Sequence, residues 1–115
     1  MRSSSDAIPA RGARRYPSEP MGLRFIWDAR KAELNRRKHR VTFEEALTVF
    51  GDVLAKIHED PGHSGQERRE IIVGHSVRAR LLLVSFAERS GLIRLISARR
   101  ATRNEKADYE DSLGT

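Results

Sequence analysis

The sequence predicts an α+β domain: a small antiparallel sheet with two N-terminal helices and one C-terminal helix. Two observations lead to this prediction. The expected elements follow the order β-α-α-β-β-β-β-α, so the helices are bunched at the two ends instead of alternating with the strands. Three successive connections between strands are short, which is typical of an antiparallel meander. At 115 residues the chain is long enough for one domain with a modest core.

The first half of the chain is expected to hold a strand, two helices and a second strand. Asp28 suits a helix N-cap, because its carboxylate can accept hydrogen bonds from the free N–H groups of the first turn. Thr42 and Glu45 have the spacing of a capping box, which starts the second helix. The elements are expected at residues 23–27, 28–39, 42–50 and 53–57, followed by a loop over 58–66.

The second half is expected to hold three more strands and a last helix. A hairpin turn at Arg89-Ser90-Gly91 separates the second of these strands from the third. Thr102 and Glu105 again have capping-box spacing, and they start the last helix. The strands are expected over 69–74, over 80–88 and from Leu92 to the arginines that precede the helix, which covers 103–111.

The strand that starts at Leu92 is apolar on both faces apart from Arg94, which indicates a central place in the sheet. Strand alternation puts Arg99 on the face of Leu95 and Arg94 on the other face, so both point into one site only if the strand bulges. Arg94 is expected to pair with an acid on the helical side. Arg99 and Arg100 lie at the positive end of the next helix dipole, where a bound phosphate would balance them.

Composition narrows the class of partner. The chain has 22 Lys and Arg against 16 Asp and Glu, and its formal charge of +6 favours a polyanion. Aromatic residues make up 6%, which is too few for a base-stacking platform. The absence of cysteine excludes disulfides, thiolate metal sites and thiol nucleophiles, and it fits the cytoplasm as the expected location. No apolar run is long enough to predict a membrane span.

The beginning of the chain differs in kind from the remainder. Residues 1–21 are rich in serine, proline and arginine, and they contain too few apolar side chains to fold alone. The pair Arg14-Arg15 is not followed by an apolar segment, so no signal peptide is expected. We therefore expect a flexible basic tail over 1–21, or a start at Met21, and a single folded domain over 22–115.

Several kinds of chemistry find no motif in the sequence. There is no P-loop, no His-Glu-x-x-His helix and no nucleophile elbow. The four histidines are not paired at metal-ligand spacing, and His58-Glu59-Asp60 with His63 is more typical of a polar surface than of a metal site. We therefore expect neither a metal ion nor another cofactor.

Arginines are unusually frequent in the predicted strands and at their ends. A guanidinium group matches two phosphate oxygens at once, so these side chains point to a phosphate ligand. Metal-free cleavage of RNA needs a base for the 2′-OH, an acid for the 5′-oxygen and cations for the developing charge. Arginine suits the third role. The arginines in question are Arg69, Arg80, Arg89, Arg94, Arg99 and Arg100.

Three side chains are candidates for the base. They are Glu88, Glu67 and His39, of which His39 has the ordinary pKa nearest to neutrality. The alternative for Glu88 is a salt bridge at the end of the hairpin, with Arg89 or Arg80. In the first helix four polar side chains fall at spacings that share one face, either as a cationic wall beside a substrate or as a solvated surface. They are Lys31, Asn35, Lys38 and His39.

A set of short motifs follows a fixed order along residues 23–110. The motifs are Phe25-Ile26-Trp27-Asp28-Ala29-Arg30-Lys31, Asn35, Lys38-His39, Val41-Thr42-Phe43-Glu44-Glu45-Ala46, Val49-Phe50-x-Asp52, Glu67-Arg68-Arg69, Gly74-x-Ser76, Leu82-Leu83-Val84, Glu88-Arg89 and Arg94-Leu95-Ile96-Ser97-Ala98-Arg99-Arg100-Ala101-Thr102, with Glu105 and Tyr109. In this order they resemble the motifs of the BrnT toxins of type II toxin–antitoxin systems. The resemblance implies a RelE-like fold and a ribonuclease that blocks translation.

The resemblance also implies partners. The expected antitoxin is BrnA-like, a small ribbon-helix-helix protein that binds DNA and forms a hetero-oligomer with the toxin. The complex would repress its own operon, so operator DNA would be bound only through the complex, while RNA is the expected substrate. The family usually has Gly after the Lys-His pair, as a left-handed helix cap, and Arg40 stands there instead. We therefore expect the helix to end differently and to move His39.

Carried over by position, the resemblance places Lys31, Asn35, Lys38, His39, Arg69, Glu88, Arg89 and Arg99 at recurrent polar positions of the family. The predicted catalytic residues are Arg99, Arg69, Glu88 and His39, and the predicted substrate-binding residues are Lys31, Lys38, Arg89 and Arg80.

Two other functions fit the same sequence. A non-catalytic module would use its basic surface to hold an antitoxin or a nucleic acid. A regulator that binds nucleic acid alone is less suited, because the chain has no recognisable recognition helix.

Overall fold

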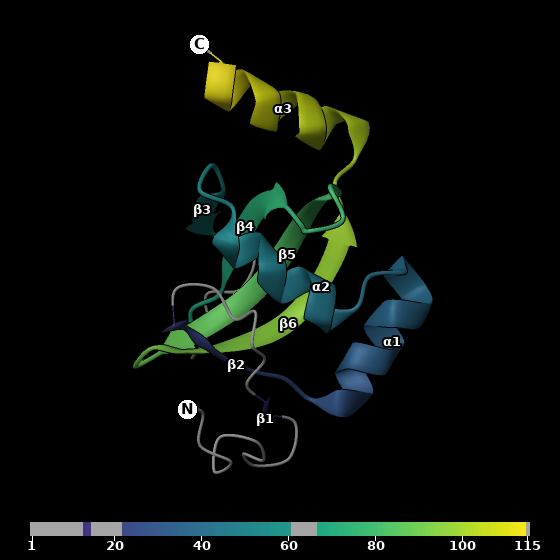
Figure 1. Ribbon diagram of the computed structural model, residues 1–115, viewed down its shortest axis with the longest axis vertical. Coiled ribbons are helices and arrows are strands. Elements are labelled where there is room, and N and C mark those ends of the chain that lie inside the picture. The colour runs from purple at the N-terminus through teal and green to yellow at the C-terminus, as the bar shows by residue number, and fades with distance from the viewer. Residues whose placement is uncertain (1–12, 15–21, 61–66, 115) are drawn as a thin grey trace.

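The structure is a computed structural model, and it describes residues 13–14, 22–60 and 67–114. The predicted α+β fold is confirmed, and the helices lie outside a curved central sheet (Figure 1). The elements are β1 (Ala13–Arg14), β2 (Arg24–Ile26), α1 (Ala29–His39), α2 (Phe43–Leu47), the 3-10 helix η3 (Thr48–Gly51), β3 (Lys56–Glu59), β4 (Glu70–His75), β5 (Leu81–Arg89), β6 (Leu92–Arg100) and α3 (Arg103–Gly114).

The sheet has six strands in the order β1-β2-β6-β5-β4-β3. The antiparallel meander from β3 to β6 is confirmed, and β6 is flanked on both sides, as its two apolar faces predict. The sheet is not wholly antiparallel, because β2 pairs with β6 in parallel. The strand β1 pairs with β2 and falls within the predicted tail, of which the remainder lies outside the described residues.

One predicted strand is displaced along the chain. It begins at Lys56 instead of Val53 because Asp52 forms a turn, in which its carboxylate accepts the N–H of Leu54 at 2.9 Å. The strand then continues through Glu59, within the segment predicted as a loop. Residues 61–66 of that loop lie outside the described part of the chain.

The main core lies between the sheet and the pair α1 and α2. Aromatic rings meet edge to face at its centre: Phe50 contacts Phe25 and Phe86, each with ring centroids 5.0 Å apart. A second, smaller cluster lies on the other face of the sheet, where Tyr109 of α3 packs on Val73 and Leu81. The two clusters show that α3 covers part of the face opposite to α1 and α2.

The strand β6 contains a bulge. Its residue Leu95 pairs with Phe86, and the next pair in register is Ser97 with Ser85, so Ile96 is an extra residue. One extra residue inverts the alternation of side chains along the remainder of the strand.

The bulge changes which residues of β6 share a face. Ile93, Leu95 and Ala98 all point into the main core and are buried. Arg94 and Arg99 therefore lie together on the opposite face, and the expectation that Arg99 shares the face of Leu95 is wrong. The sequence allowed Arg94 and Arg99 to face the same side only if the strand bulges, and the strand does bulge.

The first helix is capped as predicted and is fixed by an unpredicted buried contact. The Asp28 carboxylate accepts the N–H groups of Arg30 and Lys31, at 2.7 and 3.3 Å. Asn35 does not share a solvated face with the lysines, because it is buried and its side-chain amide donates to the carbonyls of Val41 and Ala98 at 2.9 and 2.8 Å. Its Oδ1 accepts the N–H of Ala98 at 3.0 Å.

The predicted capping box of α2 forms only in part. Thr42 Oγ1 accepts the N–H of Glu45 at 3.0 Å, but the Glu45 carboxylate turns inward. There it accepts the hydroxyl of Ser76 at 2.7 Å and the Nε of Arg80 at 2.9 Å. Burial raises the pKa of Glu45, but the hydrogen bonds from Arg80 and Ser76 outweigh it, so the pKa lies below its ordinary value. Arg80 thus joins β5 to the helix layer.

The end of α1 keeps the geometry of a glycine cap without a glycine. Arg40 has φ 60° and ψ 32°, in the left-handed region, and its N–H donates to the carbonyl of Arg36 at 2.9 Å. The expectation that the helix ends differently is therefore wrong.

Replacing Arg40 with Gly is expected to raise the free energy of unfolding by about 1 kcal/mol, because Gly adopts this conformation without steric cost. Urea denaturation measures the change. The matched control is Arg37→Gly, at an exposed position in the last turn of α1 with ordinary helical backbone, where the same substitution is expected to lower stability by up to about 1 kcal/mol. A loss of stability in Arg40→Gly would contradict the strain.

The capping box of α3 forms in full. The Glu105 carboxylate accepts the N–H of Thr102 at 2.9 Å, and Thr102 Oγ1 accepts the N–H of Glu105 at 3.1 Å. The same carboxylate accepts two hydrogen bonds from the Arg99 guanidinium, both at 2.8 Å. These contacts, that from Arg99 above all, lower the pKa of Glu105 from 4.5 to about 2.

The Glu105 contacts predict a pH-dependent contribution to stability. Because the folded pKa is depressed, the contribution is complete above pH 4.5 and is lost as the pH falls through about 2. Glu105→Gln is expected to lower the free energy of unfolding by about 1.5 kcal/mol at pH 7, since solvent screens the partly exposed pair. Urea denaturation between pH 7 and 2 should show the difference from wild type shrinking. Glu110→Gln, on the exposed side of the same helix, is the control, and a difference independent of pH would contradict the assignment.

Candidate active site

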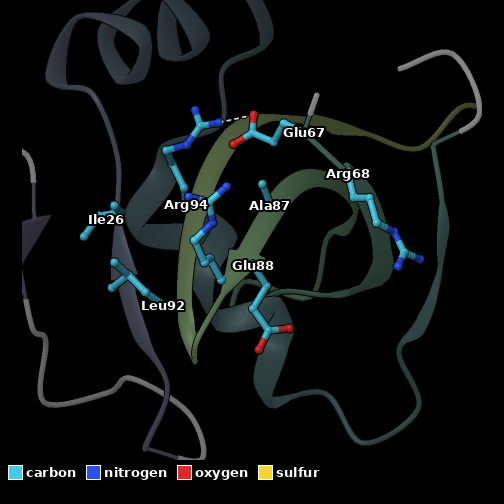
Figure 2. A pocket seen from close by; sticks show the side chains of 8 residues that line it. Ile26, Glu67, Arg68, Ala87, Glu88, Leu92 and Arg94 are labelled. Carbon is cyan, nitrogen blue, oxygen red and sulfur yellow. Dashed lines mark hydrogen bonds and ion pairs between the residues drawn. The ribbon is translucent and has the colours of Figure 1, made fainter. Parts of the chain in front are cut away.

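A cleft of about 420 Å³ lies at the end of the sheet where β5 turns into β6. Its walls come from the β5–β6 hairpin, from β2 and from the segment just before β4 (Figure 2). Two of the predicted site residues, Glu88 and Arg89, line it. The full lining is Ile26, Glu67, Arg68, Ala87, Glu88, Arg89, Leu92 and Arg94.

Glu67 is the carboxylate of the cleft that arginine side chains contact. Its Oε1 accepts a hydrogen bond from Nη2 of Arg94 (Figure 2) and lies 4.0 Å from Nε of Arg69. The hydrogen bond from Arg94 is the largest cause that lowers the pKa of Glu67, and the positive charges of Arg94, Arg69 and Arg89 lower it further. Arg94 and Arg69 therefore lie close to one carboxylate, and the charge of Arg89 also acts on it, so the carboxylate is ionised at neutral pH.

Strand pairing explains part of this arrangement. Arg94 lies opposite Ala87 of β5 and Ile26 of β2, and all three line the cleft. Arg94 does pair with an acid, as predicted, but the acid is Glu67, on the face opposite to α1 and α2 rather than on the helical side.

Glu88 lies at the rim of the cleft and is exposed. Its carboxylate points away from Glu67 and Arg94 (Figure 2). Within the described residues Glu88 forms no salt bridge, so the alternative of a bridge to Arg89 or Arg80 is wrong. Arg80 instead bonds Glu45 and the carbonyl of Arg40, at the helix layer.

Arg99 lies on the same face as Arg94 but at the other end of β6, and it is not among the residues of the cleft. Its guanidinium group binds Glu105, and this contact raises its pKa. The anion that was expected beside the two arginines before α3 is thus supplied by the chain itself, through Glu105.

The charged residues of α1 form a separate group. Lys31 and Lys38 are exposed and make no ion pair within the described residues, and His39 is partly buried at the end of the helix. None of them lines the cleft. The predicted site residues therefore fall into four places: the cleft with Arg69 beside it, the Arg99–Glu105 pair, the surface of α1 and the partly buried Arg80–Glu45 pair.

The arrangement in the cleft suits an anionic ligand. Guanidinium groups bind phosphate oxygens and stabilise charge that develops on them. Across residues 22–60 and 67–114, no group of three acidic or histidine side chains is placed to hold a metal ion. The sequence pointed to Arg69, Arg89 and Glu88 as site residues and to Glu67 as one candidate base. It did not place Arg94 in the site, because the contact partner Glu67 is 27 residues away along the chain.

Comparisons with known proteins agree with this fold. A crystal structure of the Brucella abortus ribonuclease toxin BrnT, determined at 1.1 Å resolution, is similar to the chain with a TM-score of 0.54 and 22% identity. The similarity covers 69% of this chain and 96% of that one, and it shows the fold alone. No curated protein matches. Among the described residues no helix is long and apolar enough to cross a membrane.

A match to a protein-family model identifies the family as well as the fold. Residues 27–105 match the family described as "Ribonuclease toxin, BrnT, of type II toxin-antitoxin system". This stretch begins in the core next to β2, and it ends at Glu105, so it includes α1, α2, all four strands of the meander and every residue of the cleft except Ile26. Because the match spans well over half of the sequence, the chain belongs to the BrnT family of ribonuclease toxins.

Proposed function

We propose that the chain cleaves RNA without a metal ion, that the cleft around Arg94 is its active site, and that the cleavage inhibits translation. Family membership gives the class, a ribonuclease toxin with a cognate antitoxin. The observation that supports the location is the meeting of Arg69, Arg89 and Arg94 around one carboxylate beside an open cleft.

The cleft offers the charges that the reaction needs. The scissile phosphate would replace Glu67 as the ligand of Arg94, with Arg69 and Arg89 within reach of its other oxygens. Fixed guanidinium groups need no reorganisation as negative charge develops on the phosphate, so they stabilise the transition state more than the bound substrate. The charge that a metal ion often supplies would thus come from side chains.

The other predicted roles stay predictions. Lys31 and Lys38 would bind flanking phosphates along α1, and His39 and Glu88 are rival bases. Arg99 would bind a phosphate only by giving up Glu105. A substrate-binding role for Arg80 is not favoured, because its guanidinium group is already bound to Glu45 and to the carbonyl of Arg40.

We also propose a BrnA-like antitoxin of the ribbon-helix-helix class as the partner, in a cytoplasmic hetero-oligomer that binds operator DNA through the antitoxin. The formal charge of +6 supports an acidic antitoxin segment, which would compete with RNA for the arginines of the cleft.

Purified protein is expected to cleave RNA in EDTA, and Arg94→Ala or Arg69→Ala is expected to lower the rate constant kcat by about 10²–10³-fold. A fluorescently labelled RNA, followed by gel electrophoresis, measures the rates. The control is Arg103→Ala, which removes an exposed arginine at the start of α3 that does not line the cleft.

The same experiment distinguishes the alternatives. A requirement for added metal would contradict the proposed chemistry. Equal loss of activity in Arg103→Ala and Arg94→Ala would show that general positive charge, and not this cleft, is responsible. Urea denaturation of each variant checks that the loss is not one of folding.

Expression of the chain alone is expected to arrest bacterial growth, whereas Arg94→Ala is expected to allow it, because toxicity requires cleavage. Co-expression of a neighbouring ribbon-helix-helix gene should restore growth to cells with the wild-type chain. Culture density after induction measures both effects. Arrest by Arg94→Ala at equal expression would instead indicate a module that acts by binding alone.

A further inference from the structure

We propose that Glu67 is the general base of the reaction, the group that takes the proton from the 2′-OH of the RNA. This inference rests on the proposal that cleavage occurs in the cleft around Arg94. It assigns a role that neither the family match nor the resemblance in fold provides.

The position of Glu67 is the first argument. A base must reach the 2′-OH next to the phosphate, so it must lie beside the cations that hold that phosphate. Glu67 meets this condition, since its Oε1 bonds Arg94 and lies 4.0 Å from Arg69. Its side chain is 39% exposed and faces the cleft, so a substrate can reach it.

The two rivals are less well placed. The carboxylate of Glu88 is at the rim and points away from Glu67 and Arg94 (Figure 2). His39 lies at the end of α1 and does not line the cleft. Of the candidate bases named by the sequence, Glu67 alone combines a place in the cleft with contacts to its arginines.

Glu67 removes the proton of the 2′-OH, and the 2′-oxygen forms a bond to phosphorus. The bond between phosphorus and the 5′-oxygen breaks, and that oxygen leaves with a proton taken from solvent water. The products are a 2′,3′-cyclic phosphate and a free 5′-hydroxyl, and Glu67 returns its proton to solvent.

The charges around Glu67 predict that its pKa differs between the free protein and the complex with substrate. In the free protein it faces Arg94 from β6, Arg89 from β5 and Arg69 before β4, with Glu88 and Arg68 at the walls of the cleft. These arginines lower its pKa, which makes it a weak base. A bound phosphate neutralises part of their charge and takes over the hydrogen bond of Arg94, so the pKa of Glu67 rises once the substrate is bound.

The test is the pH dependence of cleavage, measured in EDTA on a short RNA substrate. The acid limb of kcat/KM reports the base in the free enzyme, and the acid limb of kcat reports it in the complex. We expect the limb of kcat to lie at a higher pH than that of kcat/KM. We expect Glu67→Gln to lower kcat by about 10²–10⁴-fold and to abolish the acid limb.

Two further variants make the result specific. Glu67→Asp keeps a carboxylate, so it should retain the acid limb and part of the activity. Glu33→Gln removes the carboxylate of a comparable pair, that with Arg36 on the surface of α1, and should leave the profile unchanged.

Several outcomes would overturn the inference. Gln can still accept the hydrogen bond of Arg94, so an acid limb that persists in Glu67→Gln would show that Glu67 only positions this arginine. Loss of the limb in Glu88→Gln or His39→Gln, but not in Glu67→Gln, would assign the base to that residue. Full activity of Arg94→Ala and Arg69→Ala would contradict the proposed location of the site. Full activity of these two variants is therefore distinguishable from a failure of Glu67 as the base, in which only the Glu67 variants behave unexpectedly.

Discussion

The hydrogen bonds of Asn35 hold the helix layer and the sheet in register. The strand β2 pairs with β6 only as far as Arg94, so beyond that point no strand of the described residues lies beside the outer edge of β6. Asn35 carries a donor and an acceptor in one plane, like a peptide group, and it binds both the N–H and the carbonyl of Ala98. The Asn35 side chain thus forms the two hydrogen bonds with Ala98 that a neighbouring strand would form, and it fixes α1 against the sheet.

Asn35 contacts β6 at Ala98, two residues after the bulge at Ile96. The bulge inverts which side chains of β6 face the core. Ala98 points into the core only because Ile96 is an extra residue. Without the bulge, a small core side chain and a charged one would exchange faces, and Arg99 would be driven into the apolar layer. The same local irregularity therefore keeps the core apolar and gathers Arg94 and Arg99 on the open face of the sheet.

Features that depend on residues three or four apart were predicted from the sequence. The N-cap at Asp28 and the capping box of Thr102 with Glu105 are such cases, because their partners lie within one turn of helix. The inward turn of Glu45 was not predicted, since its partner Arg80 is 35 residues away. The pair of Glu67 and Arg94 was not predicted either, because the two residues are 27 positions apart in the sequence.

The two carboxylates on the open face have different consequences for function. Glu105 is held by Arg99 and also by the backbone of Thr102, so its removal would uncap α3 as well as free an arginine. Glu67 has only arginine partners within the described residues, and it lies in the cleft. A phosphate can therefore displace Glu67 from Arg94 at the cost of one partly exposed ion pair, which contributes little to stability. At Arg99 the same exchange would also disrupt a helix cap. This difference, more than the number of arginines at either end, is the reason that we propose the Arg94 end of the strand as the site for RNA.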